Sequence, residues 1–140
     1  MSISGFFGRY RFLSNFYPCR VKLNDIWYPT VENAYQAAKV PIAFRTAFSS
    51  CTPGEAKKLG RQFLLPSDWE SRKLEIMKDL VRQKFSRSSV LGKLLLQTWG
   101  EELIESNSWN DQFWGVCRGK GKNHLGRIIM EVRLRLKEER

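Results

Sequence analysis

Histidine and cysteine are scarce in this sequence of 140 residues, and this limits the chemistry it can carry. A single histidine, His124, does not supply a histidine-based metal site. The three cysteines, Cys19, Cys51 and Cys117, lack the close spacing of zinc or redox motifs. We therefore expect no metal and no cofactor. The cysteine usage, together with a start that does not resemble a signal peptide, predicts a reduced cytoplasmic protein.

Long apolar runs, repeats, low-complexity tracts and linkers are also missing. No stretch approaches the ~20 apolar residues of a membrane span, so we expect no membrane association. Hydrophobic residues make up 42% and charged residues 27% of the chain, which is typical of a globular protein and excludes collagen-like, disordered and coiled-coil classes. The length predicts one domain over residues 1–140, and the sequence assigns no oligomeric state.

Basic side chains, by contrast, are in excess. The 24 Lys and Arg residues exceed the 14 Asp and Glu residues, for a formal net charge of +10. Such a charge favours an anionic partner, for example a nucleotide, a phosphate or a nucleic acid. The alternative is a basic domain whose charge only prevents association, and charge alone does not decide between the two.

The first half of the chain predicts extended structure followed by helices. Residues 1–30 indicate strands and turns, including a hairpin over 20–28, where apolar and polar residues alternate around Asn24-Asp25. Thr30 is a good N-cap for a helix over 31–40, which Pro41 should stop. A short helical piece is expected over 42–48. Thr52-Pro-Gly-Glu55 predicts a capping box for a helix to about Leu59, with Gly60 in a left-handed C-terminal position.

The second half predicts further helices. Ser67-Asp-Trp-Glu70 should open a helix to about Phe85, and Ser88 or Ser89 should cap another through Leu96. Residues 102–105 indicate a short strand, and residues 106–122 a loop. From Asn123 on the pattern fits a helix or a strand, and its length favours a helix. The sum is an α+β fold that is mostly helical.

Glu32, Gln36 and Lys39 lie at i, i+4 and i+7 of the helix predicted over 31–40 and therefore share one face. A ligand could bind between the acid and the amine. The alternative is a solvated polar face with a favourable acid in the first turn, and the helix alone favours this alternative.

Two other segments combine aromatic and polar residues. Residues 109–115 place Asp111, Trp114 and Gly115 in one loop, where a ring can stack on a base, and Asn123 can open a helix that binds an anion. Residues 7–18 interleave aromatics with Arg9 and Arg11, which suits contact with bases and phosphates. Tryptophans and aromatics that fill the core, with glycines that serve turns, are the alternative for both.

Taken together, these segments closely resemble the YbiA/NADAR family over nearly the whole chain. The matching motifs are Phe6-Phe-Gly8 with Leu13-Ser-Asn-Phe16, Tyr28-Pro-Thr-Val-Glu32 with Gln36-Ala-Ala-Lys39, Asp111-Gln-Phe-Trp-Gly115, and Gly121-Lys-Asn-His-Leu-Gly126. The resemblance implies a single compact YbiA-like domain with a small antiparallel sheet. It also implies an N-glycosidase that cleaves the bond between a base nitrogen and the anomeric carbon of a ribose, without a metal.

Carried onto this chain, the resemblance implies three catalytic residues. Glu32 is the first candidate to stabilise positive charge on the sugar and activate water, with Asp111 as orienter or second acid-base group. Lys39 is either a Schiff-base nucleophile or an electrostatic partner for phosphate. The candidate substrate-binding residues are Phe7, Arg9, Ser14, Asn15, Phe16, Tyr35, Gln36, Arg61, Trp114, Gly115, Asn123 and Gly126.

The family implies two substrates, and we expect the partner to be one of them. The net charge of +10 favours ADP-ribosylated guanine in nucleic acid. A phosphorylated ribosyl small molecule, an intermediate of riboflavin biosynthesis, is the other. A non-catalytic module that binds ADP-ribose or nucleic acid is a third possibility, and a basic structural protein a fourth.

Overall fold

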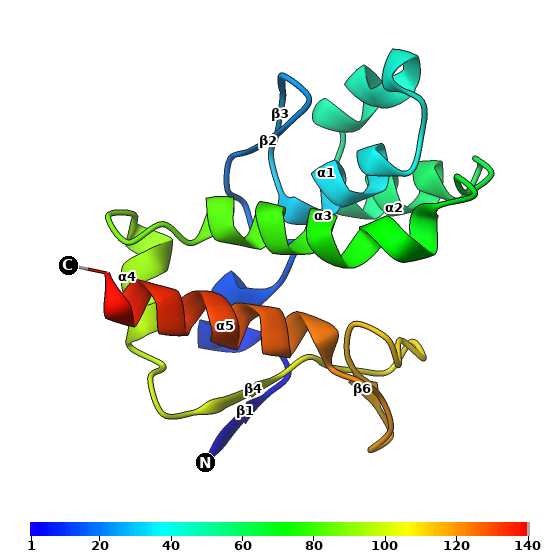
Figure 1. Ribbon diagram of the computed structural model, residues 1–140. Coiled ribbons are helices and arrows are strands. Elements are labelled where there is room, and N and C mark those ends of the chain that lie inside the picture. Colours follow the sequence, from blue (N-terminus) through cyan, green and yellow to red (C-terminus); the bar gives the residue numbers. More distant parts are fainter. Residues whose placement is uncertain (140) are drawn as a thin grey trace. The chain divides into compact units, whose positions relative to one another are not determined.

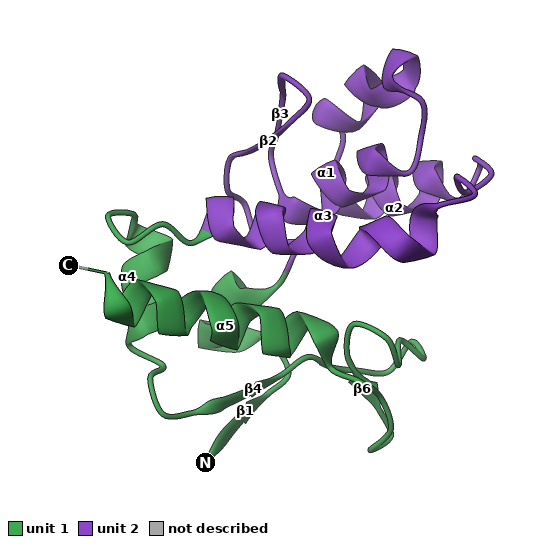
Figure 2. Ribbon diagram, in the orientation of Figure 1, with its two compact units in different colours: residues 1–14, 85–140 green, residues 15–84 purple. Residues whose placement is uncertain are grey.

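The computed structural model describes residues 1–139, which form two compact units (Figures 1 and 2). Unit 1 contains residues 1–14 and the chain from residue 85 on, and unit 2 contains residues 15–84. Helices outweigh short two-stranded sheets, which confirms the mostly helical α+β class. The single domain over residues 1–140 stays a prediction.

Unit 2 begins with the predicted hairpin. Strands β2 (Val21–Leu23) and β3 (Ile26–Tyr28) pair antiparallel, with Val21 opposite Tyr28. Asn24 and Asp25 link them with φ angles of 48° and 64°, the left-handed conformation that a tight two-residue hairpin turn requires. This pair is the small antiparallel sheet expected from the sequence.

Helix α1 (Val31–Ala38) lies at the centre of unit 2. The Thr30 side chain accepts a hydrogen bond from the Asn33 amide, which confirms the N-cap, and the helix ends before Pro41. All eight helical residues are buried. The helix contacts the hairpin, η2 (Ile42–Ser49), α2 (Pro53–Gly60) and α3 (Trp69–Lys84). A solvated polar face, the alternative for Glu32 and Gln36, is therefore excluded.

The expected capping box of α2 is present, since Thr52 and Glu55 each accept a hydrogen bond from the other's backbone amide. The expectation for Gly60 was wrong. It is the last residue of α2 rather than a left-handed cap, and Arg61 after it keeps a helical φ of −68°. The reason for a glycine here is close packing, described with the site below.

As far as residue 139, unit 1 contains two parallel strand pairs and two α-helices. Strand β1 (Ser2–Ser4) pairs with β4 (Glu102–Ile104), and β5 (Ser106–Asn107) with β6 (Val116–Cys117). Helix α5 (His124–Glu138) packs on β4 and on α4 (Val90–Leu96), which Ser89 caps. The helical choice for the C-terminal segment is thus confirmed, whereas the loop expected over 106–122 contains two short strands.

The N-terminal segment differs from the extended structure that we expected. Gly8–Leu13 form a 3-10 helix, η1, in which the amides of Tyr10 and Ser14 donate to the carbonyls of Phe7 and Arg11. This tight turn buries Phe12 and Leu13 together, and Leu13 is completely inaccessible. Burial of the two side chains outweighs the weaker hydrogen-bond geometry of a 3-10 helix.

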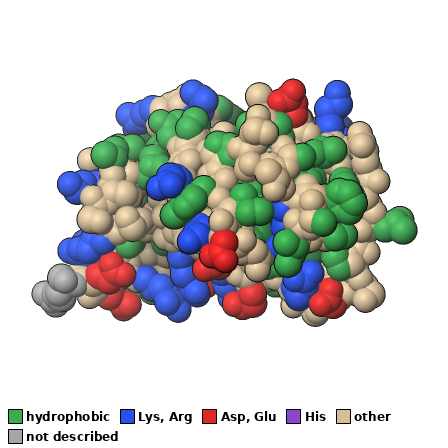
Figure 3. All heavy atoms as spheres, turned by 90° about the horizontal axis from the view of Figure 1, so that it is seen from above, with side chains coloured by type: hydrophobic (Ala, Val, Ile, Leu, Met, Phe, Trp, Pro, Cys, Tyr) green, Lys and Arg blue, Asp and Glu red, His purple; other side chains and the backbone are tan. Residues whose placement is uncertain are grey.

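Basic side chains are spread over the face of the molecule that is shown in Figure 3. On this face, Lys and Arg side chains are interspersed with hydrophobic ones. This agrees with the excess of 24 basic over 14 acidic residues and with the absence of a basic tail in the sequence.

Candidate functional site

Glu32 is a buried acid in the first turn of α1. Its side chain is 8% exposed, and its Oε2 accepts a hydrogen bond of 2.6 Å from Gln36 Nε2, one turn further along the helix. The Glu32 amide donates to the Asn15 carbonyl at 3.1 Å, which ties the start of the helix to the segment before the hairpin. The carboxylate is therefore held in one orientation from both ends of the residue.

Gln36 is fixed in turn by close packing against α2. It is 4% exposed, and its Oε1 has no hydrogen-bond partner within the part of the chain that the structure describes. A Cβ on Gly60 would lie 2.2 Å from this oxygen, so only glycine admits the amide at this distance. Gly60 is a site-supporting residue that sequence reasoning missed, although it lies in a Leu-Gly-Arg piece that matches the family.

Lys39 follows α1 and lies among aromatic rings and other cations. Its Nζ is 5.0 Å from the Tyr35 ring centroid and 5.9 Å from that of Trp69, and these two rings are themselves 5.3 Å apart. Burial lowers the pKa of Lys39, and the nearby cations lower it further, whereas the Glu32 carboxylate opposes the shift. The cations are Lys57, Arg61 and Lys73. Lys39 is thus predisposed to lose its proton, as a nucleophilic amine must.

The other predicted residues of unit 2 differ in exposure. Asn15 contacts Met77, with 3.5 Å between Nδ2 and Sδ. Phe16 and Arg61 are exposed, whereas Tyr35 is buried against Trp69. Trp69 was missed as a site residue because its position suggested only the start of α3.

Asp111 shapes the tryptophan loop of unit 1, which we define as residues 108–115. Its Oδ1 accepts hydrogen bonds from the amides of Phe113 (3.2 Å) and Trp114 (2.9 Å), an arrangement that closes a turn. The half-buried Trp114 ring meets Phe113 edge-on at 4.8 Å, and His124 packs on Phe113 at 4.5 Å. The Asp111 carboxylate therefore fixes the turn of this loop, and its catalytic role stays a prediction.

The predicted glycines and Asn123 join α5 and this loop to strand β4. The Asn123 Nδ2 donates to the Leu103 carbonyl and its Oδ1 accepts from the Glu105 amide, both at 2.9 Å. A Cβ on Gly126 would lie 2.2 Å from the Leu103 carbonyl oxygen, and one on Gly115 would lie 2.1 Å from Glu105 Oε2. These residues have structural roles, and phosphate binding by Asn123 stays a prediction.

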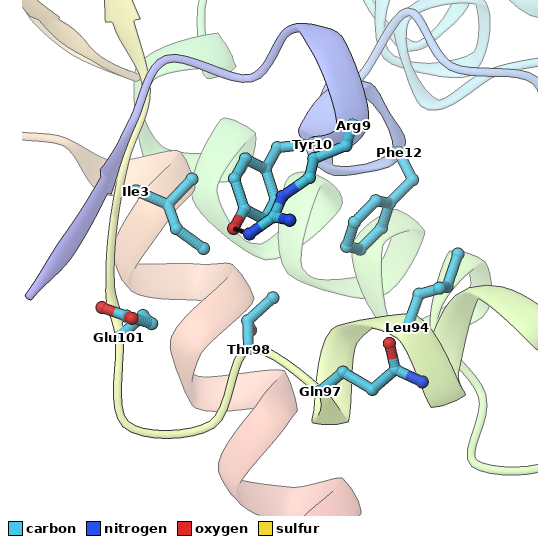
Figure 4. A pocket seen from close by; sticks show the side chains of 8 residues that line it. All are labelled: Ile3, Arg9, Tyr10, Phe12, Leu94, Gln97, Thr98 and Glu101. Carbon is cyan, nitrogen blue, oxygen red and sulfur yellow. Dashed lines mark hydrogen bonds between the residues drawn. The ribbon is translucent and has the colours of Figure 1, made fainter.

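The N-terminal candidates lie in and around η1. Arg9 lines a cavity of about 400 Å³ in unit 1, where its Nη2 donates to the Tyr10 hydroxyl at 2.6 Å (Figure 4). Phe7 is 68% exposed, and the Ser14 amide closes η1. Sequence reasoning did not anticipate this cavity, whose other lining residues are Ile3, Phe12, Leu94, Gln97, Thr98 and Glu101.

Among residues 1–139, no group of three or more His, Cys, Asp or Glu side chains could hold a metal ion. In the same residues, no helix has the length and apolar character needed to cross a membrane.

Comparison with known proteins gives a family match over most of the chain. The family model described as the NADAR domain matches residues 6–137. The chain is 39% identical over 132 residues to N-glycosidase Npun_R5314 of Nostoc punctiforme, covering 89% of this chain and 84% of that protein. It is 36% identical over 132 residues to N-glycosidase YbiA of Escherichia coli, covering 91% and 82%.

Other relatives are longer proteins with a different name. The chain is 36% identical to the riboflavin biosynthesis protein VVA0006 of Vibrio vulnificus, but it spans only 36% of that protein's length. Among solved structures, the NMR structure of Escherichia coli YbiA matches with a TM-score of 0.84 and 32% identity, covering all of this chain and 88% of the other. This match confirms the expected YbiA-like fold.

Proposed function

The chain belongs to the NADAR domain family, and on this premise we propose that it is an N-glycosidase that hydrolyses the bond between a ribose and a base. The names of two relatives, N-glycosidases, support this proposal. The observation that carries it is the buried Glu32 carboxylate, held by Gln36 at 2.6 Å on a helix that is followed directly by Lys39, an amine of lowered pKa. A module that only binds nucleotides has no need of such a pair.

Glu32 supplies the negative charge that the reaction requires. As the C–N bond breaks, its electron pair leaves with the base, which takes up a proton from solvent, and positive charge develops on the ribose ring. A carboxylate that is already oriented stabilises this charge without reorganisation. It then accepts a proton from the water that attacks the anomeric carbon.

Lys39 offers a covalent route to the same products. Its neutral amine attacks the anomeric carbon as the base departs, and ring opening gives an imine, which water hydrolyses to the free sugar and the amine. The lowered pKa of Lys39 supports this role, because only the unprotonated amine is a nucleophile. An electrostatic contact with phosphate is the alternative role of Lys39.

We place the remaining predicted residues in substrate binding. Trp114, Phe7 and Phe16 present rings that can stack on a base or line the sugar. Arg9 and Arg61 are suited to phosphate, and Asn15 to ribose hydroxyls. Asp111 acts on Trp114, through the turn that it closes, rather than on the sugar.

ADP-ribosylated guanine in nucleic acid is the substrate that we favour. The cations around Lys39, namely Lys57, Arg61 and Lys73, favour an anionic substrate at this helix. The net charge of +10 further favours a polyanion. The second candidate is a phosphoribosylated intermediate of riboflavin biosynthesis, which the name of the Vibrio relative supports.

One experiment tests the reaction and the substrate together. The protein is incubated side by side with an ADP-ribosylated guanine oligonucleotide and with phosphoribosylated riboflavin intermediates, and the released base or ADP-ribose is measured. Glu32→Gln should still bind the substrate, but its turnover should fall by about 100-fold or more. Glu131→Gln, at an exposed position of α5, should keep the turnover of the native protein. Release that is undiminished in Glu32→Gln would remove this residue from the mechanism. Binding without release by the native protein would identify a module that only binds.

A further inference from the structure

Asn107 lies at the base of the tryptophan loop and contacts both ends of the Asp111 backbone. It is the last residue of β5, and β6 resumes at Val116 after the loop. The Asn107 Nδ2 donates to the Asp111 carbonyl at 2.9 Å, and its Oδ1 accepts from the Asp111 amide at 3.0 Å. One side chain therefore replaces the pair of hydrogen bonds that a neighbouring strand would provide.

Glu105 holds the Asn107 amide in this orientation. Its Oε2 accepts a hydrogen bond from Asn107 Nδ2 at 3.2 Å. Because a carboxylate oxygen accepts only from the NH₂ group, this contact fixes which end of the Asn107 side-chain amide faces Glu105. The same oxygen lies against Gly115, where a Cβ would approach to 2.1 Å. Glu105, Asn107 and Gly115 thus form a packed base on which the loop closes.

The hydrogen bonds continue from Asn107 to the tryptophan. Asn107 fixes the Asp111 backbone, and the Asp111 carboxylate fixes the amides of Phe113 and Trp114. The first two amides of α5 donate to the carbonyls of Phe113 and Trp114, so the start of α5 holds the C-terminal end of the loop. Asn107 holds the loop at Asp111. The turn at Asp111, which precedes Trp114, therefore depends on the Asn107 side chain.

We propose that Asn107 is a positioning residue for substrate binding, which holds the turn that presents Trp114. The inference rests on the proposed function, in which Trp114 contacts the substrate. Asn107 itself touches no reacting atom in this scheme. Its loss should weaken binding of the base and leave the chemistry at the sugar nearly unchanged.

Two substitutions separate this role from a general effect on folding. Asn107→Ala removes both hydrogen bonds to Asp111. Asn107→Asp keeps the acceptor but turns a charged oxygen toward two other acceptors, the Asp111 carbonyl and Glu105 Oε2. When the new carboxyl group is protonated, its O–H again donates, so a fall in pH should restore the contact. Ser108→Ala, at the exposed next position, is the matched control.

The first measurement is made on the free protein and needs no substrate. Hydrogen exchange at the amides of Asp111, Phe113 and Trp114 should quicken about 10-fold in Asn107→Ala, while exchange in the middle of α5 stays unchanged. Unchanged exchange in the loop would overturn the inference. Faster exchange throughout unit 1 would also overturn it, because it would show a general loss of stability.

The second measurement is the split between KM and kcat with the substrate that the native protein cleaves. Asn107→Ala and Asn107→Asp should raise KM about 10-fold at pH 8 and change kcat less than 2-fold. Relative to the native protein at each pH, Asn107→Asp should recover as pH falls toward 5, and Asn107→Ala should not. A native KM in both variants, or no recovery of Asn107→Asp, would refute the role in binding. If the native protein releases no base at all, the proposed function fails, and hydrogen exchange alone then decides whether Asn107 holds the turn.

Discussion

Gly60→Ala tests whether the packing of α2 on Gln36 orients the catalytic acid. The added Cβ would lie 2.2 Å from Gln36 Oε1, which is about 1 Å inside an ordinary contact. If the amide retreats by about that 1 Å, the 2.6 Å hydrogen bond to Glu32 lengthens to about 3.6 Å and is broken. The loss of a hydrogen bond to a charged group costs about 1.5–3 kcal/mol.

Stability and activity should respond differently to this substitution. Overpacking costs about 1–3 kcal/mol, but alanine in the last turn of a helix regains up to about 1 kcal/mol of helix propensity. With the about 1.5–3 kcal/mol of the lost hydrogen bond added, we expect a fall of about 1.5–6 kcal/mol in the free energy of unfolding, measured by urea titration. The kcat for base release should fall by about 10-fold or more, because a misoriented carboxylate no longer faces the developing charge.

A control and a double-mutant cycle make this prediction refutable. Gly54→Ala lies in the first turn of the same helix, where a Cβ would meet nothing within 4 Å, and it should leave kcat unchanged. On a Gln36→Ala background the obstructed amide is gone, so Gly60→Ala should have almost no further effect on kcat. If Gly60→Ala is as active as Gly54→Ala, or if the two losses simply add, Gln36 does not transmit the effect to Glu32.

The remaining predictions concern the half-buried Lys39 and the buried Lys84. Reduction with borohydride during turnover should add the mass of the sugar at Lys39, and absence of an adduct in an active preparation would exclude the imine route. Burial lowers the pKa of Lys84 to about 7, and Cys19 is the group that opposes this shift. Because the unfolded chain binds this proton up to its ordinary pKa, 10.5, and the folded chain only up to about 7, stability should rise with pH above 7. The titrations should end near pH 9. Burial raises the pKa of the Cys19 thiol, and above that pH this shift makes stability fall with pH instead of rise. Lys84→Met should reduce this rise in a series of denaturant titrations and leave the part contributed by Lys39, whose pKa is also lowered, whereas Lys93→Met, at an exposed position, should retain all of it.

Local signals in the sequence predicted most of the elements. Thr30, Thr52 and Ser89 each cap the helix expected after them, because capping depends on residues three positions apart. The turn of the hairpin was predicted from the adjacent residues Asn24 and Asp25, which is also a local signal. The 3-10 helix η1 was not predicted, because it forms where the burial of Phe12 and Leu13 outweighs weak local preference.

The site was predictable in its polar residues but not in what supports them. Spacing along the helix placed Glu32 and Gln36 on one face, and the structure adds the hydrogen bond between them. Neither Gly60 nor Asn107 had a local signal for its role. Gly60 is required because the Gln36 side chain of α1 packs against it. Asn107 is important because the loop brings the Asp111 backbone within hydrogen-bond distance of its side chain. Such contacts depend on the tertiary fold, which helix and strand periodicity do not encode.

The buried polar face of α1 is itself an argument for function. A helix at the centre of a unit would be more stable with apolar side chains in place of Glu32 and Gln36, because burial of polar groups costs free energy unless every hydrogen bond is made. In this helix one hydrogen bond is not made, since Gln36 Oε1 is buried without a hydrogen-bond partner in the described residues. The hydrogen bond of 2.6 Å between Gln36 and Glu32 offsets only part of the free-energy cost of burying them. An arrangement that lowers stability but fixes a carboxylate in one orientation is expected where the carboxylate must meet a transition state.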